Sequence, residues 1–239
     1  MSKKQLFLSV LAFFVFCLHF AQHTCAYGQN NDPRAQKIID DMAARFKTFP
    51  SVSIDFSITI TSIHNNSESV QNGKIWIKGE KYKLEIPDYV IYFDGAKVYQ
   101  YLTAVNEVVI TKPDPYDDDE GIQLLNPQTY FNLSSRNFLS NFLRESVYTC
   151  ASRSASNNRS VSEIDLYPIL LETSRFSRIR IKIERTTSQL VFMRAFMING
   201  VQYTLNFMPY SVHQTALRDS FFVFNEKEHP DVEVIDLTF

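Results

Sequence analysis

Side chains that could carry out catalysis or bind a metal are few in this sequence and lie far apart. The histidines after residue 26 are His64, His213 and His229, and no two of them have the short spacing typical of zinc ligands. The sequence also lacks a G-x-S-x-G nucleophile elbow, a P-loop and a paired-glycine dinucleotide motif. With only 6 glycines in the whole chain, a glycine-rich phosphate cradle is disfavoured. These observations predict a protein that is not an enzyme, with no catalytic site, no metal site and no cofactor.

Two further features could indicate chemistry, and each has a simpler interpretation. The acidic run over residues 117–120 misses the spacing of an EF-hand calcium loop, which favours a solvated acidic loop. Cys150 could be a reactive thiol, but a small apolar residue of the core or of a loop is the preferred interpretation. Cys17 and Cys25 lie in a segment that we expect to be removed, so Cys150 would have no disulfide partner in the mature chain.

The N-terminal residues have the organisation of a secretory signal peptide. Lys3 and Lys4 precede an apolar stretch over residues 6–20, and the small residues of 24–26 offer a cleavage site. The apolar stretch is shorter than the roughly 20 residues needed to span a bilayer, so a transmembrane anchor is the less favoured alternative. We expect residues 1–26 to be the signal peptide and residues 27–239 to form a single domain in the periplasm.

Composition limits the kinds of partner that this domain could bind. Of 24 basic and 26 acidic residues, Lys3 and Lys4 would leave with the signal, which changes the formal charge from −2 to −4. An acidic balance disfavours a nucleic-acid partner. Aromatic residues make up 14% of the chain, which indicates a large apolar interior or binding surface. We expect the protein to be a monomer.

The sequence changes abruptly from a helical period to a strand period. Asp32-Pro33 is typical of a helix N-cap followed by proline at the first helical position. Apolar and polar residues then alternate over 52–61, and the alternation returns over 81–86, 178–184 and 201–207. Strands with one apolar and one polar face are typical of antiparallel sheets. The apolar positions of the expected first helix are Ile38, Ile39, Met42, Ala43 and Phe46.

The remaining elements are less regular. Hairpin turns are expected at Asp94-Gly95 and Asn199-Gly200. After Asn126-Pro127, the aromatic and leucine residues between 130 and 143 predict one or two short helices inserted into the strand order, which could act as a lid. Residues 152–160 are expected to form a polar loop. The less regular strands are expected over residues 74–78, 90–93, 97–102, 108–112, 161–167, 190–198 and 221–224.

These elements define the expected fold class. About eleven strands and only two or three helical stretches leave a long apolar sheet face that needs a second layer. A second sheet, closure into a barrel, or curvature over a few helices could cover that face, and the amphipathic helices favour the third arrangement. We therefore predict a mainly β fold with a helical lid (α+β): a half-open antiparallel β-barrel of about eleven strands, whose concave face is covered by α-helices.

Several short motifs occur in an order that resembles a known family. They are the stretch from Gly73 to Trp76, the Asp94-Gly95 turn followed by Val98 and Tyr99, and the closing pair Phe222-Val223-Phe224 and 229–236. In order, they resemble the G-x-L-W, D-G-x-x-x-W/Y and F-x-F…P-x-V-x-V-I-D elements of the LolA family of outer-membrane lipoprotein carriers. The resemblance extends over essentially the whole mature chain.

The resemblance implies a function that the residues alone do not. It implies a periplasmic chaperone in lipoprotein transport, with a hydrophobic cavity that binds lipoprotein acyl chains. Such a carrier accepts lipoproteins from an inner-membrane ABC-type transporter and delivers them to the outer membrane, where a receptor could receive them. The alternative is a pathway-associated paralogue: a LolA-like carrier or sensor of another lipid or hydrophobic small molecule.

Strand alternation identifies the side chains expected to face the cavity, and the helical stretches identify the lid. The predicted cavity residues are Ile54, Phe56, Ile58, Tyr82, Leu84, Ile91, Phe93, Ile181, Ile183, Tyr203, Leu205 and Phe207. The predicted lid residues are Ile39, Met42, Phe46, Phe131, Phe138 and Phe142.

One position departs from the family pattern. Family members often carry Arg-Pro after the tryptophan strand, and this arginine is associated with holding the lid, whereas Gly79 and Glu80 occupy the matching positions here. Lys78 and Lys81 are the neighbouring cations, but lysine lacks the planar fork of donors that arginine offers to carbonyl oxygens. The sequence therefore indicates that the lid is fastened in another way.

Overall fold

A computed structural model describes residues 31–113, 126–131, 138–150, 157–169 and 174–238. In the described part, helix α2 (Pro33–Phe46) begins as predicted: the Asp32 carboxylate accepts hydrogen bonds from the backbone N–H groups of Arg34 and Ala35. Ala35, Ile39 and Met42 form its buried face. No described helix is long and apolar enough to cross a membrane.

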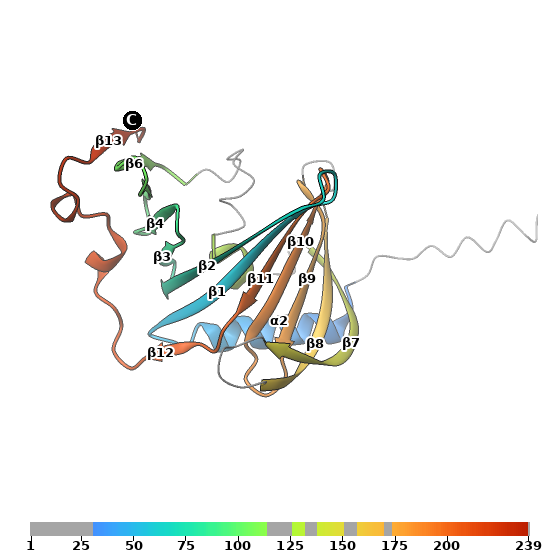
Figure 1. The fold of residues 1–239 in the computed structure, drawn as a ribbon. Coiled ribbons are helices and arrows are strands. Elements are labelled where there is room, and N and C mark those ends of the chain that lie inside the picture. Colours follow the sequence, from blue (N-terminus) through green and yellow to red (C-terminus); the bar gives the residue numbers. More distant parts are fainter. Residues whose placement is uncertain (1–30, 114–125, 132–137, 151–156, 170–173, 239) are drawn as a thin grey trace, which may run out of the picture. The chain divides into compact units, whose positions relative to one another are not determined.

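The described strands form one sheet of 13 strands (Figure 1). The strand order is β13-β6-β5-β4-β3-β2-β1-β11-β10-β9-β8-β7, and β12 pairs with one end of β1. The strand bounds are β1 Ser51–Ser62, β2 Ser67–Lys78, β3 Lys81–Glu85, β4 Tyr89–Phe93, β5 Val98–Leu102, β6 Glu107–Thr111, β7 Phe138–Cys150, β8 Asn157–Pro168, β9 Phe176–Glu184, β10 Leu190–Met197, β11 Val201–Phe207, β12 Ser211–His213 and β13 Glu233–Asp236.

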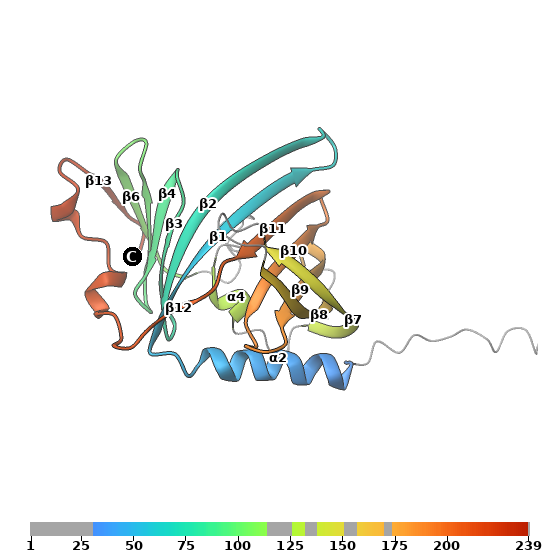
Figure 2. The same cartoon turned by 60° about the horizontal axis from the view of Figure 1, so that its bottom comes forward.

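The register of the central strands follows the alternation in the sequence. Phe56 of β1 lies opposite Phe207 of β11, and Ile58 lies opposite Leu205. Since successive side chains of a strand point to opposite faces, this register places the apolar residues of both strands on one face, here called the inner face. Helix α2 and the one-turn helix α4 (Gln128–Phe131) lie on that side of the sheet (Figure 2).

The predicted fold class is correct in its mainly β character and in its helical cover, and the structure differs from it in the number of strands, in the direction of one strand and in part of the lid. The described sheet has 13 strands, its outermost strands β13 and β7 do not pair with each other, and β13 pairs with β6 in parallel. The sheet is therefore mixed and is not closed into a barrel. The cover consists of one long helix and one helical turn, because part of the expected helical lid is a strand.

That strand is β7, which contains Phe138 and Phe142. The prediction of a helix here is wrong, because a spacing of four residues fits a helix face and a strand face equally well. A bulge lies between Phe142 and Arg144: Phe142 is opposite the inner-face residue Ile164, whereas Arg144 is opposite Glu163. The extra residue shifts the alternation by one position, so that Arg144 and Ser146 lie on the same face as Glu163.

The outer face of β7, β8 and β9 is covered by charged side chains. Asp165 is almost completely buried and receives two hydrogen bonds from Arg180, at 2.7 and 2.9 Å. Burial opposes the charge of Glu163, but hydrogen bonds from Ser146 and Lys182 lower the pKa of its carboxyl group. These pairs explain how two buried carboxylates are tolerated on this face.

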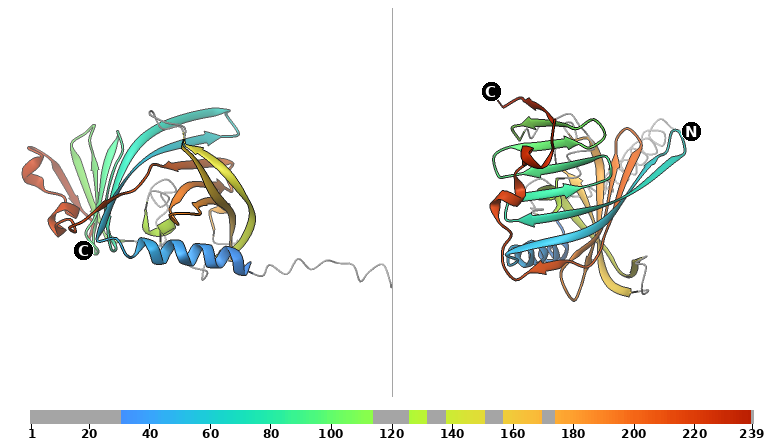
Figure 3. Two further views of the ribbon diagram at one scale, coloured as in Figure 1. Left: turned by 90° about the horizontal axis from the view of Figure 1, so that it is seen from below. Right: turned by 60° about the vertical axis from the view of Figure 1, so that its left-hand side comes forward.

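The C-terminal segment corrects another expectation. Residues 221–224 do not form a strand; the 3₁₀ helix η2 (Asp219–Phe222) occupies part of that stretch, followed by η3 (Glu226–Glu228) and β13. The segment, red in the right-hand view of Figure 3, lies against the outer side of the green strands. Phe224 packs there with Tyr92, Val108 and Ile110. The outer face of β4 to β6 is thus apolar and covered.

Several sequence predictions fall outside the described residues. They are the signal peptide over 1–26, the acidic run over 117–120 and the first part of the expected loop over 152–160. From Asn157 onward, the expected loop is strand β8, so its predicted C-terminal end lies too late in the chain.

Candidate functional site

The inner face and the two helices form one apolar cluster, here called the inner cluster. It contains all the residues predicted to line a cavity, and of these only Phe93 and Tyr203 are not fully buried. In this structure the side chains pack against one another. The sheet register therefore brings the predicted residues together, and their contact with a ligand stays a prediction.

The six predicted lid residues also belong to the inner cluster, from three different elements. Ile39 and Met42 are buried on α2, and Phe131 is buried on α4. Phe46, at the end of α2, is half-buried and stacks on Phe131 with 4.4 Å between ring centroids. The other two predicted lid residues, Phe138 and Phe142, pack against the cluster from strand β7.

Aromatic rings fill the space between the C-terminal end of α2 and the sheet. Phe131 lies 5.8 Å from Phe207 and 5.9 Å from Tyr210 between ring centroids, and Phe46 also meets Tyr210 edge-on. Sequence reasoning missed Tyr210, because it lies beside Pro209, outside every alternating segment. Edge-to-face and offset ring pairs of this kind stabilise a packed cluster by about 0.5–1.5 kcal/mol each.

A pocket opens at this end of the helix. It has a volume of about 400 Å³, and its walls combine apolar rings and branched side chains with one lysine and one glutamate. Val52 and Ile77 belong both to its wall and to the inner cluster. The pocket is here called the mouth pocket, and its lining residues are Phe46, Lys47, Phe49, Val52, Ile77, Gly79 and Glu80.

Gly79, which replaces the arginine of the family pattern, has a backbone reason to be glycine. Lys78 and Lys81 pair across the β2–β3 hairpin, so Gly79 and Glu80 form its two-residue loop. Gly79 has a φ of 56°, in the left-handed region that favours glycine. Lys78 and Lys81 do not reach toward the lid; both bind Asp219 of the C-terminal segment, at 2.7 and 3.2 Å.

The N-terminal end of α2 is fastened to strand β7. The Asp32 backbone N–H donates to the Ser140 carbonyl at 2.9 Å, and the Ser140 N–H donates to the Asn31 side chain at 2.8 Å. Arg34 forms an ion pair with Glu145 and lies 3.8 Å above the centre of the Phe142 ring. Polar contacts thus hold one end of the helix, while ring contacts cover the other.

Two tyrosines lie deep in the inner cluster. Tyr82 on β3 is 4% exposed and Tyr130 on α4 is 2% exposed, and burial raises the pKa of both hydroxyls. Neither hydroxyl has a hydrogen-bond partner among the residues that the structure describes. Burying a hydroxyl without a partner costs about 1–3 kcal/mol. By contrast, the hydroxyl of Tyr210 donates to the Leu190 carbonyl at 2.9 Å.

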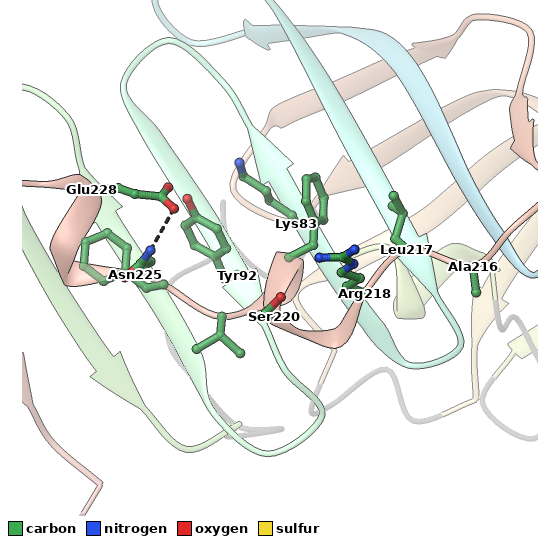
Figure 4. A pocket seen from close by; sticks show the side chains of 11 residues that line it. Lys83, Tyr92, Ala216, Leu217, Arg218, Ser220, Asn225 and Glu228 are labelled. Carbon is green, nitrogen blue, oxygen red and sulfur yellow. Dashed lines mark hydrogen bonds between the residues drawn. The ribbon is translucent and has the colours of Figure 1, made fainter.

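A second pocket, of about 780 Å³, lies on the outer face, beneath the C-terminal segment (Figure 4). Its wall includes Lys83, Tyr92, Arg218 and Glu228. Lys83 is paired with Glu85 at 2.7 Å. Although this pocket is larger, its charged wall suits an apolar chain poorly, so the inner cluster is the better candidate for binding a lipid. Within the described part, no three His, Cys, Asp or Glu side chains gather as metal ligands.

Comparisons with known proteins give one family. The family model described as outer membrane lipoprotein carrier protein LolA matches residues 24–185. A search of curated protein sequences found no match.

Solved structures with a similar fold come from several bacteria. A LolA superfamily protein from Nitrosomonas europaea is 10% identical, with 80% of this chain and 97% of that chain covered and a TM-score of 0.43. An uncharacterized conserved protein from Thermus thermophilus is 10% identical, with 85% and 99% covered and a TM-score of 0.48. The Mycobacterium tuberculosis lipoprotein LppX is 12% identical, with 77% and 100% covered and a TM-score of 0.43. Likeness at this level carries no argument about what this chain binds.

Proposed function

The chain belongs to the family of outer membrane lipoprotein carrier protein LolA, and from this we propose that it is a periplasmic carrier of lipoproteins. Its acyl-chain site is the inner cluster, reached through the mouth pocket. The carrier takes lipoproteins from the inner membrane and delivers them to the outer membrane. The family membership confirms the resemblance that the sequence motifs indicated.

The observation that carries the proposal is the continuity between the mouth pocket and the inner cluster. Val52 and Ile77 belong to both, so an apolar chain entering the pocket continues directly into the apolar interior. Hiding an acyl chain of about 14 methylenes from water is worth on the order of 11 kcal/mol, at about 0.8 kcal/mol per methylene. An interior of this kind supplies that environment.

Loading requires the packed rings to move, because side chains fill the inner cluster. We assign the movement to the C-terminal end of α2, where Phe46 and Phe49 border the mouth pocket. The other end stays on β7 through Asp32 and Arg34. The helix then acts as a lid hinged at its N-terminal end, with the ring stack of Phe46 on Phe131 as the contact that opens.

The free energy of hiding acyl chains from water also indicates which partners the carrier needs. One acyl chain binds a membrane only reversibly, but two chains on the same protein anchor it stably, so a carrier of such lipoproteins needs a loader. The family membership favours an inner-membrane ABC-type transporter in that role and a receptor at the outer membrane. We propose that the protein acts as a monomer, without a cofactor, and that residues 27–239 form the carrier domain.

The first experiment is native mass spectrometry of the protein purified from its own periplasm, together with displacement of a hydrophobic fluorescent dye by palmitoyl lipids. We expect a co-purified lipoprotein, or diacylated lipid, and displacement of the dye. A different lipid in the spectrum would favour the alternative carrier or sensor. Absence of any lipid and of dye binding, with the circular dichroism of a folded protein, would refute the carrier proposal.

A pair of variants tests the site. Phe49→Asp places a charge at the mouth pocket, and we expect at least about tenfold weaker dye binding, because an aspartate must be desolvated when a chain enters. The matched control is Val70→Asp, on an exposed position of β2 with 59% of its surface accessible. Equal binding by both variants would show that the mouth pocket is not the entrance.

A further inference from the structure

The two buried tyrosines carry hydroxyl groups that can donate hydrogen bonds, and the packing of their rings does not require these groups. Tyr82 and Tyr130 come from different elements, β3 and α4, and both belong to the inner cluster. Buried tyrosine hydroxyls ordinarily find a hydrogen-bond partner, because leaving one unpaired is costly. Within the described residues neither of these hydroxyls has one.

Neither of the two hydroxyl oxygens is completely enclosed. Among the described residues, the fully enclosed side-chain atoms without a partner are Gln36 Oε1 and His213 Nε2, so the tyrosine oxygens are not completely sealed off. They also lie near each other, since a charge on Tyr82 would raise the pKa of Tyr130 further.

Tyr82 is one contact away from the wall of the mouth pocket, and Tyr130 is two contacts away. Ile77, which lines the pocket, is the cross-strand partner of Tyr82. Phe46, which also lines it, stacks on Phe131, and the Phe131 ring lies 4.9 Å from the ring of Tyr130. A chain that passes from the pocket into the interior therefore reaches Tyr82 behind Ile77 and Tyr130 behind Phe46 and Phe131.

We propose that the hydroxyls of Tyr82 and Tyr130 donate hydrogen bonds to the carbonyl oxygens at the polar end of a bound acyl chain. This inference rests on the proposed function and deepens it. The ligand it selects is a chain linked through a neutral ester or amide, whose carbonyl groups accept hydrogen bonds and whose tail continues into the apolar part of the inner cluster.

A free carboxylate is disfavoured at the same place. The burial that raises the pKa of both hydroxyls equally opposes the charged form of a carboxyl group. The mouth pocket contributes Lys47 together with Glu80, so its wall offers no net positive charge. The tyrosines thus discriminate a neutral acyl ester from a fatty-acid anion and from a plain hydrocarbon.

The test compares three C16 probes on the mature protein at pH 7: methyl palmitate, palmitate and hexadecane, each measured by dye displacement. The variants are Tyr82→Phe, Tyr130→Phe and the double variant, which keep both rings and remove only the hydroxyls. Tyr101→Phe is the control, because that tyrosine packs on the outer face with Phe224 and its hydroxyl already donates to the Asn106 side chain at 2.9 Å.

We expect the unmodified protein to bind methyl palmitate more tightly than the other two probes. The double variant should lose about tenfold in affinity for methyl palmitate and should bind hexadecane unchanged. Tyr101→Phe should leave the ratio between the affinities for methyl palmitate and for hexadecane unchanged.

Each outcome has a distinct meaning. If the double variant binds methyl palmitate as tightly as the unmodified protein, the tyrosine proposal is overturned while the carrier proposal stands. Tighter binding of palmitate than of the ester would also overturn it. If the unmodified protein binds none of the probes, the carrier proposal itself fails. Retention of the unmodified protein's thermal midpoint by each variant shows that the fold is intact.

Discussion

At the scale of single residues, close approach explains one glycine of the sheet. Gly73 of β2 lies opposite Phe56 of β1. A Cβ atom at Gly73 would lie 2.5 Å from Cζ of Phe56 and 2.7 Å from the Glu85 carbonyl oxygen. Since the second of these atoms is backbone, it cannot turn away. The absence of a side chain at Gly73 is therefore what allows the Phe56 ring to sit in the inner cluster.

The close approach of Phe56 and Glu85 to Gly73 predicts that even an added methyl group at this position destabilises the fold. Gly73→Ala should lower the free energy of unfolding by about 1–3 kcal/mol, because added atoms in a packed core force neighbours out of their positions. Urea unfolding followed by circular dichroism measures the change. The control is Asn72→Ala on the same strand, at an exposed position, for which we expect a change within about 0.5 kcal/mol. Equal stability of the two variants would mean that the strands separate freely at Gly73.

At the scale of elements, ion pairs and ring contacts hold the C-terminal segment on the sheet. Lys78 and Lys81 both bind Asp219, and Lys78 also donates to the Leu217 carbonyl at 2.8 Å. Trp76, the only tryptophan of the chain, meets Phe221 edge-on at 5.6 Å. Hydrogen bonds from Lys78 and then from Lys81 lower the pKa of the Asp219 carboxyl group.

The lowered pKa predicts release of this segment in acid. A carboxyl group whose folded pKa is below its ordinary value stabilises the bound arrangement above about pH 4, and this contribution is lost as the pH falls through the folded value. The fluorescence of Trp76 should therefore shift to the red as the pH falls below about 4. In Asp219→Asn we expect a red-shifted spectrum already at pH 7 and a smaller change with acid. An unaltered titration in this variant would assign the transition to other carboxyl groups.

At the scale of the described molecule, the sheet separates the inner cluster from the apolar residues packed under the C-terminal segment (Tyr92, Val108, Ile110 and Phe224), here called the outer cluster. The inner cluster includes Phe207, whose ring neighbours are Phe56, Tyr130 and Phe131. The outer cluster includes Phe224, which packs with Tyr92, Tyr101 and His229. The two phenylalanines share no ring neighbour among the described residues, so the stability of the sheet and the binding of a ligand can be varied separately.

This separation predicts additive effects on stability and unequal effects on binding. Phe207→Leu and Phe224→Leu should each lower the free energy of unfolding by about 1–2 kcal/mol, and the double variant should equal their sum within about 0.5 kcal/mol. Only Phe207→Leu should change the affinity for methyl palmitate. A matching change in Phe224→Leu would place the lipid on the outer side, in the pocket of Figure 4.

The amino-acid sequence by itself determined which side chains share a face. Alternation is a local property of a strand, so the inner positions of β1, β3, β9 and β11 could be identified without knowing their neighbours, and all of them meet in the inner cluster. The N-cap at Asp32 is equally local. The ordered motifs were sufficient to indicate the family.

Only the tertiary structure decided what lies opposite each face. The spacing of Phe138 and Phe142 is compatible with a helix and with a strand. The segment that contains them is a strand because it pairs with β8. Lys78 finds its partner Asp219 141 residues later, and β13 joins β6 in parallel from a similarly distant part of the chain. The burial of the Tyr82 and Tyr130 hydroxyls, which have no hydrogen-bond partner within the described part of the chain, is a further example. Such contacts join residues far apart in the chain, so the local spacing of residue types in the sequence does not predict them.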